Sequence, residues 1–168
     1  GVLESGTIEM LKKAGVSDRL EKEGFDHDGI QLSFKNHGFR INLKELTNKH
    51  VTVYGQTEVT KDLYRIIKKE NGRIINNAEG VLPQAIDTDK PFVTFKKNGV
   101  EKKIMCDLVA GCDGFHGISR SIIPKSIIKT YERTYPFGWL GILSETPPVS
   151  DELIYANHGN GCLLYTSP

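Results

Sequence analysis

Apolar residues recur with a helical period in two main parts of the chain. Residues 5–15 form a short amphipathic pattern that stops at a glycine, which is typical of a helix end. A longer helix is predicted from Thr57 to about Asn71, and we expect its apolar stripe to be buried on one face. The stripe is formed at spacings i, i+4, i+7 and i+8 by Val59, Leu63, Ile66 and Ile67. Shorter helices are predicted at residues 20–24 and 116–122.

Alternation of apolar and polar residues predicts strands in the rest of the chain. Residues 30–34 and 39–43 alternate on either side of a short glycine-containing link, which predicts a β-hairpin. A second hairpin is predicted where Asn98-Gly99 separates residues 92–95 from residues 100–105. Further strands are expected at residues 51–54, from Arg73 onward, and at residues 108–111, 135–143 and 153–155.

The order of these elements is not a regular alternation of strand and helix, so the pattern predicts an α+β fold. The sequence contains no Gly-x-Gly-x-x-Gly, the glycine pattern of the dinucleotide-binding βαβ unit. That unit therefore cannot be completed from this chain alone.

Composition limits the possible partners. The chain has 168 residues, 38% of them hydrophobic, with 22 basic and 21 acidic residues and a net charge of +1. A surface without excess charge of one sign does not attract nucleic acid or an anionic membrane, and no apolar run approaches the roughly 20 residues that span a bilayer. Three cysteines without metal-ligand spacing are typical of reduced thiols in a cytoplasmic protein.

The passage around Asp113-Gly114 is the most informative for chemistry. A predicted strand runs into Asp-Gly and then into a helix start, where backbone N–H groups can donate hydrogen bonds to phosphate oxygens. The alternative is a plain turn, because Asp-Gly is a common turn dipeptide. His116 and Arg120 lie four residues apart, so on a helix they would share one face and could bind a pyrophosphate or 2′-phosphate. The alternative is that both are solvated surface residues.

Three further residues have a functional and an ordinary interpretation. Gln56 could point its amide into a ligand cleft or could cap the following helix. His27 lies between two aspartates, which predicts an acidic loop, and could relay protons or simply be solvated. Tyr155 alternates as in a strand and could be a packing residue. The residues alone indicate a cofactor-binding α+β protein, with the cofactor left open.

Four sequence blocks resemble those of flavin-dependent aromatic monooxygenases. They are residues 51–60 (VTVYGQTEVT), 110–120 (AGCDGFHGISR), 135–141 (YPFGWLG) and 153–158 (LIYANH). The Asp-Gly block is shared widely among flavin monooxygenases, whereas the block at residues 153–158 is more specific. The similarity covers residues 1–161.

The resemblance implies FAD as cofactor, NADPH as cosubstrate, and hydroxylation of 4-hydroxybenzoate to 3,4-dihydroxybenzoate with O2. It also implies a cytoplasmic enzyme, a homodimer when complete, with a small aromatic acid as substrate. Tyr155 matches the tyrosine bonded to the substrate phenol oxygen, and His27 matches the outer histidine of its proton relay. The positions that match cofactor contacts are Gly1, Val2, Gln56, Asp113, Gly114, His116 and Arg120.

The chain also departs from the family pattern. Its fold is expected to lack the N-terminal βαβ unit of the FAD-binding part and some of the β-sheet substrate domain. The serine and arginines that hold the substrate carboxylate are not found, so a flavin hydroxylase of another phenolic acid is an alternative. A NAD-dependent Rossmann oxidoreductase and a cofactor-free interaction module are less favoured alternatives.

The last residues differ from the family. We expect residues 162–168 (CLLYTSP) to be a non-native tail, because residues 162–167 match the translation of a transposase-adapter sequence, TGT CTC TTA TAC ACA TCT.

Overall fold

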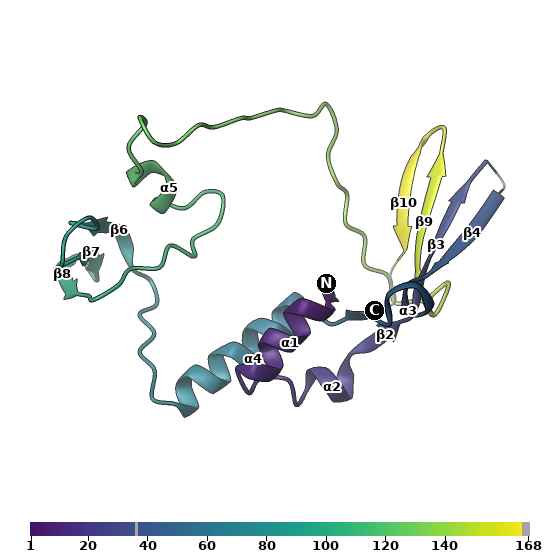
Figure 1. The fold of residues 1–168 in the computed structure, drawn as a ribbon, viewed down its shortest axis with the longest axis horizontal. Helices are drawn as coiled ribbons and strands as arrows, with labels where there is room; N and C mark the ends of the chain where they lie inside the picture. The colour runs from purple at the N-terminus through teal and green to yellow at the C-terminus, as the bar shows by residue number, and fades with distance from the viewer. Residues whose placement is uncertain (36, 166–168) are drawn as a thin grey trace. The chain divides into compact units, whose positions relative to one another are not determined.

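The computed structural model describes residues 1–35 and 37–165, which belong to two compact units. Unit 1 contains Gly1–Arg73 together with the segment that begins at Ile142, and unit 2 contains Ile74–Gly141. Helices and strands occur in both units (Figure 1), so the α+β prediction is confirmed.

Unit 1 contains the helices α1 (Ser5–Lys13), α2 (Leu20–Glu23), α3 (Leu43–Thr47) and α4 (Gln56–Lys69). The periodicity predicted α1, α2 and α4 but not α3. At the start of helix α3 the Asn42 side-chain oxygen accepts a hydrogen bond from the Glu45 backbone N–H. The Asn42 side-chain NH2 group in turn donates to the Glu45 carboxylate. This reciprocal capping explains why Leu43, expected in a strand, starts a helix instead.

A three-stranded antiparallel sheet lies at the start of unit 1. Its strands are β1 (Val2–Glu4), β5 (Val51–Val53) and β2 (Phe25–His27), in the order β1-β5-β2. Val53 therefore pairs with Val2 on one side and with Phe25 on the other.

The second sheet of unit 1 joins distant parts of the sequence. The predicted hairpin of β3 (Gly29–Phe34) and β4 (His37–Asn42) is confirmed, with Ile30 opposite Ile41. A second hairpin, β9 (Leu153–His158) and β10 (Gly161–Tyr165), lies beside it (Figure 1), and β9 pairs in parallel with β3.

Strand β10 includes residues 162–165 of the expected non-native tail, and Thr166, Ser167 and Pro168 lie outside the described residues. Backbone pairing says nothing about the origin of a segment, so the tail stays a prediction.

The stripe predicted to be buried on α4 is not buried. Leu63 and Ile67 are 37% and 38% exposed, whereas the buried residue of this helix is Asp62. Val59 and Ile66 of the stripe are only partly buried, while Asp62 faces polar partners inside unit 1. The small core includes Val16, Leu20, Val53, Tyr54 and Leu153.

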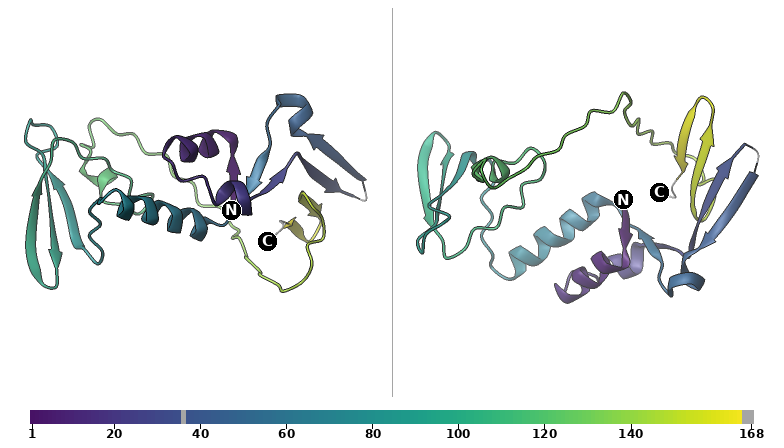
Figure 2. Two further views of the ribbon diagram at one scale, coloured as in Figure 1. Left: turned by 90° about the horizontal axis from the view of Figure 1, so that it is seen from below. Right: turned by 45° about the horizontal axis from the view of Figure 1, so that its top comes forward.

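Unit 2 is organised around the antiparallel sheet of β6 (Glu79–Gln84), β7 (Phe92–Lys97) and β8 (Val100–Met105), with α5 (Ser119–Ile122) near β6 (Figure 2). The predicted β7–β8 hairpin is confirmed. Asn98 and Gly99 both have positive φ angles, 52° and 75°, as this tight turn requires.

Other predictions for this part of the chain are wrong. The strand expected from Arg73 begins only at Glu79, and residues 108–111 and 135–143 form no strand in the described structure. An isolated strand leaves its backbone groups unpaired, and neither apolar segment has a partner strand among the described residues. The helix expected at residues 116–122 is shortened to Ser119–Ile122.

Candidate functional site

Three of the predicted cofactor-contacting residues meet at the start of α4. The Gly1 carbonyl accepts a hydrogen bond of 2.9 Å from the Tyr54 backbone N–H, which places β1 beside the β5–α4 connection. A Cβ atom on Gly1 would lie 3.9 Å from the Gln56 backbone nitrogen, so the two predicted positions are neighbours. Val2 follows in β1, opposite Val53. We call Gly1, Val2 and Gln56 the helix-start cluster.

The start of α4 is suited to an anion. The N-cap is Gly55, with no side-chain capping hydrogen bond, so the alternative that Gln56 caps the helix is wrong. The first N–H groups of a helix lack intrahelical partners, and the helix dipole favours negative charge there. The exposed, uncapped start of this 14-residue helix therefore fits a phosphate-bearing cofactor such as FAD.

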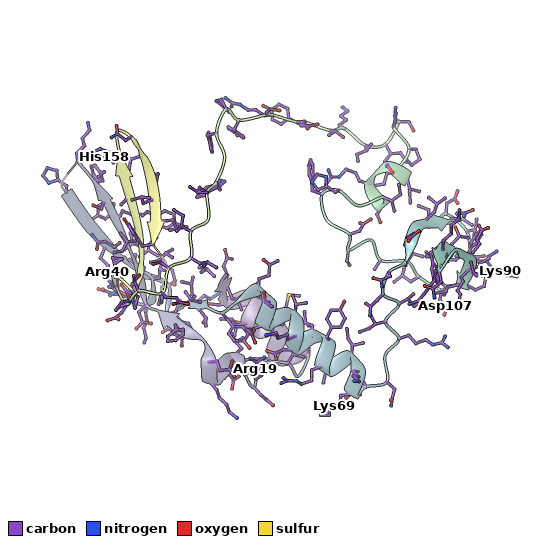
Figure 3. All side chains as sticks on the ribbon, turned by 180° about the vertical axis from the view of Figure 1, so that it is seen from behind. Arg19, Arg40, Lys69, Lys90, Asp107 and His158 are labelled. Atoms are coloured by element: carbon purple, nitrogen blue, oxygen red, sulfur yellow. The ribbon has the colours of Figure 1, made fainter. Side chains whose placement is uncertain are left out.

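A partly buried ionic network lies behind this helix start. The Tyr54 hydroxyl donates a 2.7 Å hydrogen bond to Asp62, and the Arg19 guanidinium donates to Asp62 at 2.8 Å and to Glu58 at 2.6 Å. Arg19 also pairs with Glu23 of α2, so it joins α2 to α4 (Figure 3). Burial, followed by the hydrogen bond to Asp62, raises the pKa of Tyr54 to about 12. We call Tyr54, Asp62, Arg19 and Glu58 the Tyr54 network.

Sequence reasoning missed the Tyr54 network. One signal was available, because Asp62 lies three residues after Val59 and four before Ile66 and therefore interrupts the apolar stripe. The partner that stabilises its charge, Arg19, is 43 positions away and could not be identified from local spacing.

His27 is not on a solvated loop. It lies in β2, opposite Val51, and is only 1% exposed. Its Nδ1 accepts a 3.1 Å hydrogen bond from the Leu153 backbone N–H at the beginning of β9. The prediction of an acidic loop was wrong because the neighbouring Asp26 accepts a hydrogen bond from Thr52 of β5, which keeps this segment in a strand.

Tyr155 lies two residues after Leu153 on β9. Successive side chains alternate between the faces of a strand, so Leu153 and Tyr155 share one face. The Tyr155 side chain is 38% exposed, and the residue lies between Leu32 of β3 and Leu164 of β10. The structure thus brings His27 to the strand that carries Tyr155, and the tyrosine stays accessible to a small molecule. We call these two residues the relay pair, after the role that the resemblance implies for them.

A salt bridge holds the beginning of β9 beside the relay pair. Arg40 of β4, which is labelled in Figure 3, donates two hydrogen bonds to the Glu152 carboxylate, at 2.6 and 2.7 Å. The hydrogen bonds from Arg40 lower the pKa of Glu152 below its ordinary range. This bidentate contact supports the parallel pairing of β3 with β9.

The loop that carries the Asp-Gly motif is in unit 2. The Asp113 carboxylate accepts a 2.9 Å hydrogen bond from the Ser119 backbone N–H, and contacts with Ser119 lower the pKa of Asp113. Gly114 has a φ of +69°, and a Cβ atom on Gly117 would overlap the Asp113 carboxylate. We call residues 111–119 the Asp113 loop. The conformation of the Asp113 loop therefore depends on Gly114 and Gly117 and on Asp113, whose carboxylate is already hydrogen-bonded to Ser119 within the same loop.

His116 and Arg120 do not share a helix face. His116 precedes α5, which begins at Ser119 because Asp113 binds the backbone there. Both residues instead contact the Phe115 ring, His116 edge-on at 5.0 Å and Arg120 through its guanidinium at 5.0 Å. Both basic side chains lie on the exposed side of this loop.

The remaining features of the described residues do not suggest a different kind of site. A cavity of about 190 Å³ in unit 1 is lined by the end of β1, the start of α1, α3 and the region at the start of β5, and it touches none of the predicted site residues. No cluster of three or more metal-ligating side chains occurs among residues 1–35 and 37–165. Within the same residues, no helix has the length and apolar character needed to cross a membrane.

Comparison with known proteins agrees with a flavin-binding site. Residues 1–167 match the family described as FAD binding domain. The chain belongs to the FAD-binding domain family. This family match also includes most of the expected non-native tail, whose origin an alignment does not determine.

One curated relative of this FAD-binding chain is p-hydroxybenzoate hydroxylase from Acinetobacter baylyi. The two are 45% identical over 166 residues, which is 98% of this chain and 41% of the relative. The chain therefore spans about two fifths of the relative's length. The resemblance to flavin-dependent aromatic monooxygenases stated from the sequence is confirmed.

Proposed function

We propose that this chain is part of an NADPH-consuming, FAD-dependent hydroxylase that converts 4-hydroxybenzoate to 3,4-dihydroxybenzoate. The observation that carries the proposal is the 45% identity to p-hydroxybenzoate hydroxylase over 98% of the chain. The proposal places the enzyme in the cytoplasm, which agrees with three free cysteines.

In this proposal the helix-start cluster and the Asp113 loop each supply cofactor-contacting residues. The uncapped start of α4 would receive a phosphate oxygen, and the Gln56 amide would hydrogen-bond the cofactor. The Asp113 loop, with His116 and Arg120 on its exposed side, would hold the cofactor and the phosphates of NADPH. The bound FAD would supply the redox chemistry and the activation of O2.

The relay pair would act on the substrate. The Tyr155 hydroxyl would hydrogen-bond the phenol oxygen and favour its deprotonated form, which makes the ring carbon nucleophilic. The proton would pass toward His27.

The test compares hydroxylation with flavin reduction in the complete protein. Tyr155→Phe removes a hydrogen bond to a charged oxygen, a contact worth about 1.5–3 kcal/mol, and should reduce product formed per NADPH oxidised much more than the anaerobic reduction rate. His27→Asn should reduce coupling less, because water can partly replace an outer relay member. Tyr131→Phe, at a tyrosine that is 86% exposed, serves as control. Full coupling in Tyr155→Phe, or equal loss of reduction and coupling, would make Tyr155 a packing residue.

Substrate choice is tested separately. The complete protein should be assayed with 4-hydroxybenzoate and with other phenolic acids at matched concentrations. Faster coupled turnover of a different phenolic acid would replace the proposed substrate and leave the flavin chemistry in place.

A further inference from the structure

The Tyr54 network connects the three segments that meet at the start of α4. Tyr54 belongs to the connection between β5 and α4, and its backbone N–H binds the Gly1 carbonyl. Its hydroxyl binds Asp62, about two turns into the same helix. One residue therefore holds β1 through its backbone and α4 through its side chain.

Arg19 extends this connection to a fourth segment. Its guanidinium contacts Glu58 and Asp62, which are four residues apart and thus on one face of the first turns of α4. The same guanidinium binds Glu23 of α2 with two hydrogen bonds. The rotation of α4 about its axis, and therefore the direction of Gln56, is fixed by side chains that do not belong to the helix-start cluster.

Two members of this network are more deeply buried than the residues of an ordinary surface ion pair. Tyr54 and Asp62 are 4% and 7% exposed, and a buried carboxylate is tolerated only where it is paired and hydrogen-bonded. Breaking such a network by removing one partner leaves the other groups uncompensated, so the segments they join should move. By contrast, Tyr64 on the same helix is 49% exposed.

We propose that the Tyr54 network is a positioning device that fixes the first turn of α4 against β1 and so sets where the helix-start cluster meets the flavin. This inference rests on the proposed function, and it adds residues that act through Gly1 and Gln56 without touching the cofactor. Substitutions in the Tyr54 network should therefore lower flavin affinity much more when Gln56 is present than when it has been replaced.

The test measures FAD binding to the flavin-free complete protein by quenching of flavin fluorescence. Tyr54→Phe and Asp62→Asn should each weaken binding about tenfold, and Tyr64→Phe should leave it unchanged. In a Gln56→Ala background, Tyr54→Phe should weaken binding by less than about threefold, because coupled residues are not additive. If Tyr54→Phe does not fold, Glu58→Gln, which removes a partly exposed contact with Arg19, should show the same dependence on Gln56 with a smaller effect.

A second measurement does not require flavin. Hydrogen exchange of the flavin-free protein should be faster in Tyr54→Phe for residues 1–4 and 55–59 and unchanged at the end of α4. Unchanged exchange of residues 1–4 and 55–59 in Tyr54→Phe would overturn the inference. So would a Tyr54→Phe effect on FAD affinity that is the same with and without Gln56. Failure of the unsubstituted protein to bind FAD would instead overturn the proposed function, and the exchange experiment would still decide whether the network fixes the helix start.

Discussion

Replacing His27 tests whether this buried ring stabilises unit 1 through its hydrogen bond or through its apolar surface. In His27→Leu, the Leu153 N–H at the start of β9 loses its acceptor in a place where Leu153 is only 4% exposed. A buried donor without a partner costs about 1–3 kcal/mol, so we expect the free energy of unfolding to fall by that amount. Leucine has a volume similar to histidine, so a cavity contributes little.

His27→Asn is the matched variant. The Oδ1 atom of asparagine can occupy about the position of Nδ1 and accept the same N–H. We therefore expect His27→Asn to be the more stable of the two variants, although leucine buries more apolar surface. The assay is urea denaturation of the complete protein followed by circular dichroism, together with the exchange rate of the Leu153 amide. A more stable His27→Leu, or equal protection of that amide in both variants, would refute the reasoning.

Three further predictions concern pH, the Asp113 loop and the isolated chain. Arg40 lowers the folded-state pKa of Glu152 below its ordinary 4.5, so their ion pair stabilises the protein above pH 4.5, and this stabilisation is lost as the pH falls through the lowered pKa. The Glu152→Gln variant should therefore lose up to about 1 kcal/mol of the pH-dependent stability, measured as urea midpoints at pH 3–7. Gly117→Ala should weaken cofactor binding at least about tenfold by displacing Asp113, whereas Gly138→Ala, with no neighbouring atom within 4 Å, should not. The 168-residue chain alone should bind FAD more weakly than about 1 µM in a fluorescence titration, and sub-micromolar binding would contradict this.

Local signals predicted the elements whose structure depends on nearby residues. The β7–β8 hairpin follows from Asn98-Gly99, and α1 and α4 follow from their periodicity. These features require only contacts within a few residues, which a sequence pattern contains directly.

The errors occurred where a distant partner decides the outcome. His27 is buried because its ring meets Leu153, 126 positions away, and Asp62 is buried because Arg19 neutralises it. Residues 135–143 have the apolar character of a strand, but no described strand pairs with them. The Asp113-Gly114 motif was found because Asp-Gly needs a specific backbone conformation, whereas the start of the following helix at Ser119 depended on a side-chain contact.

The parallel pairing of β3 with β9 also determines the order in which the chain can fold. Unit 2 is continuous in sequence, so all of its strand pairings are complete once residue 105 has been synthesised. Unit 1 is interrupted by unit 2, and β3 and His27 must wait for residues 153–158 to leave the ribosome. Chains acquire structure from the N-terminus during synthesis, and contacts between distant residues form slowly. The edge of β3 is thus unprotected throughout the translation of unit 2, and this is the interval in which a nascent chain is most exposed to aggregation or to capture by a chaperone.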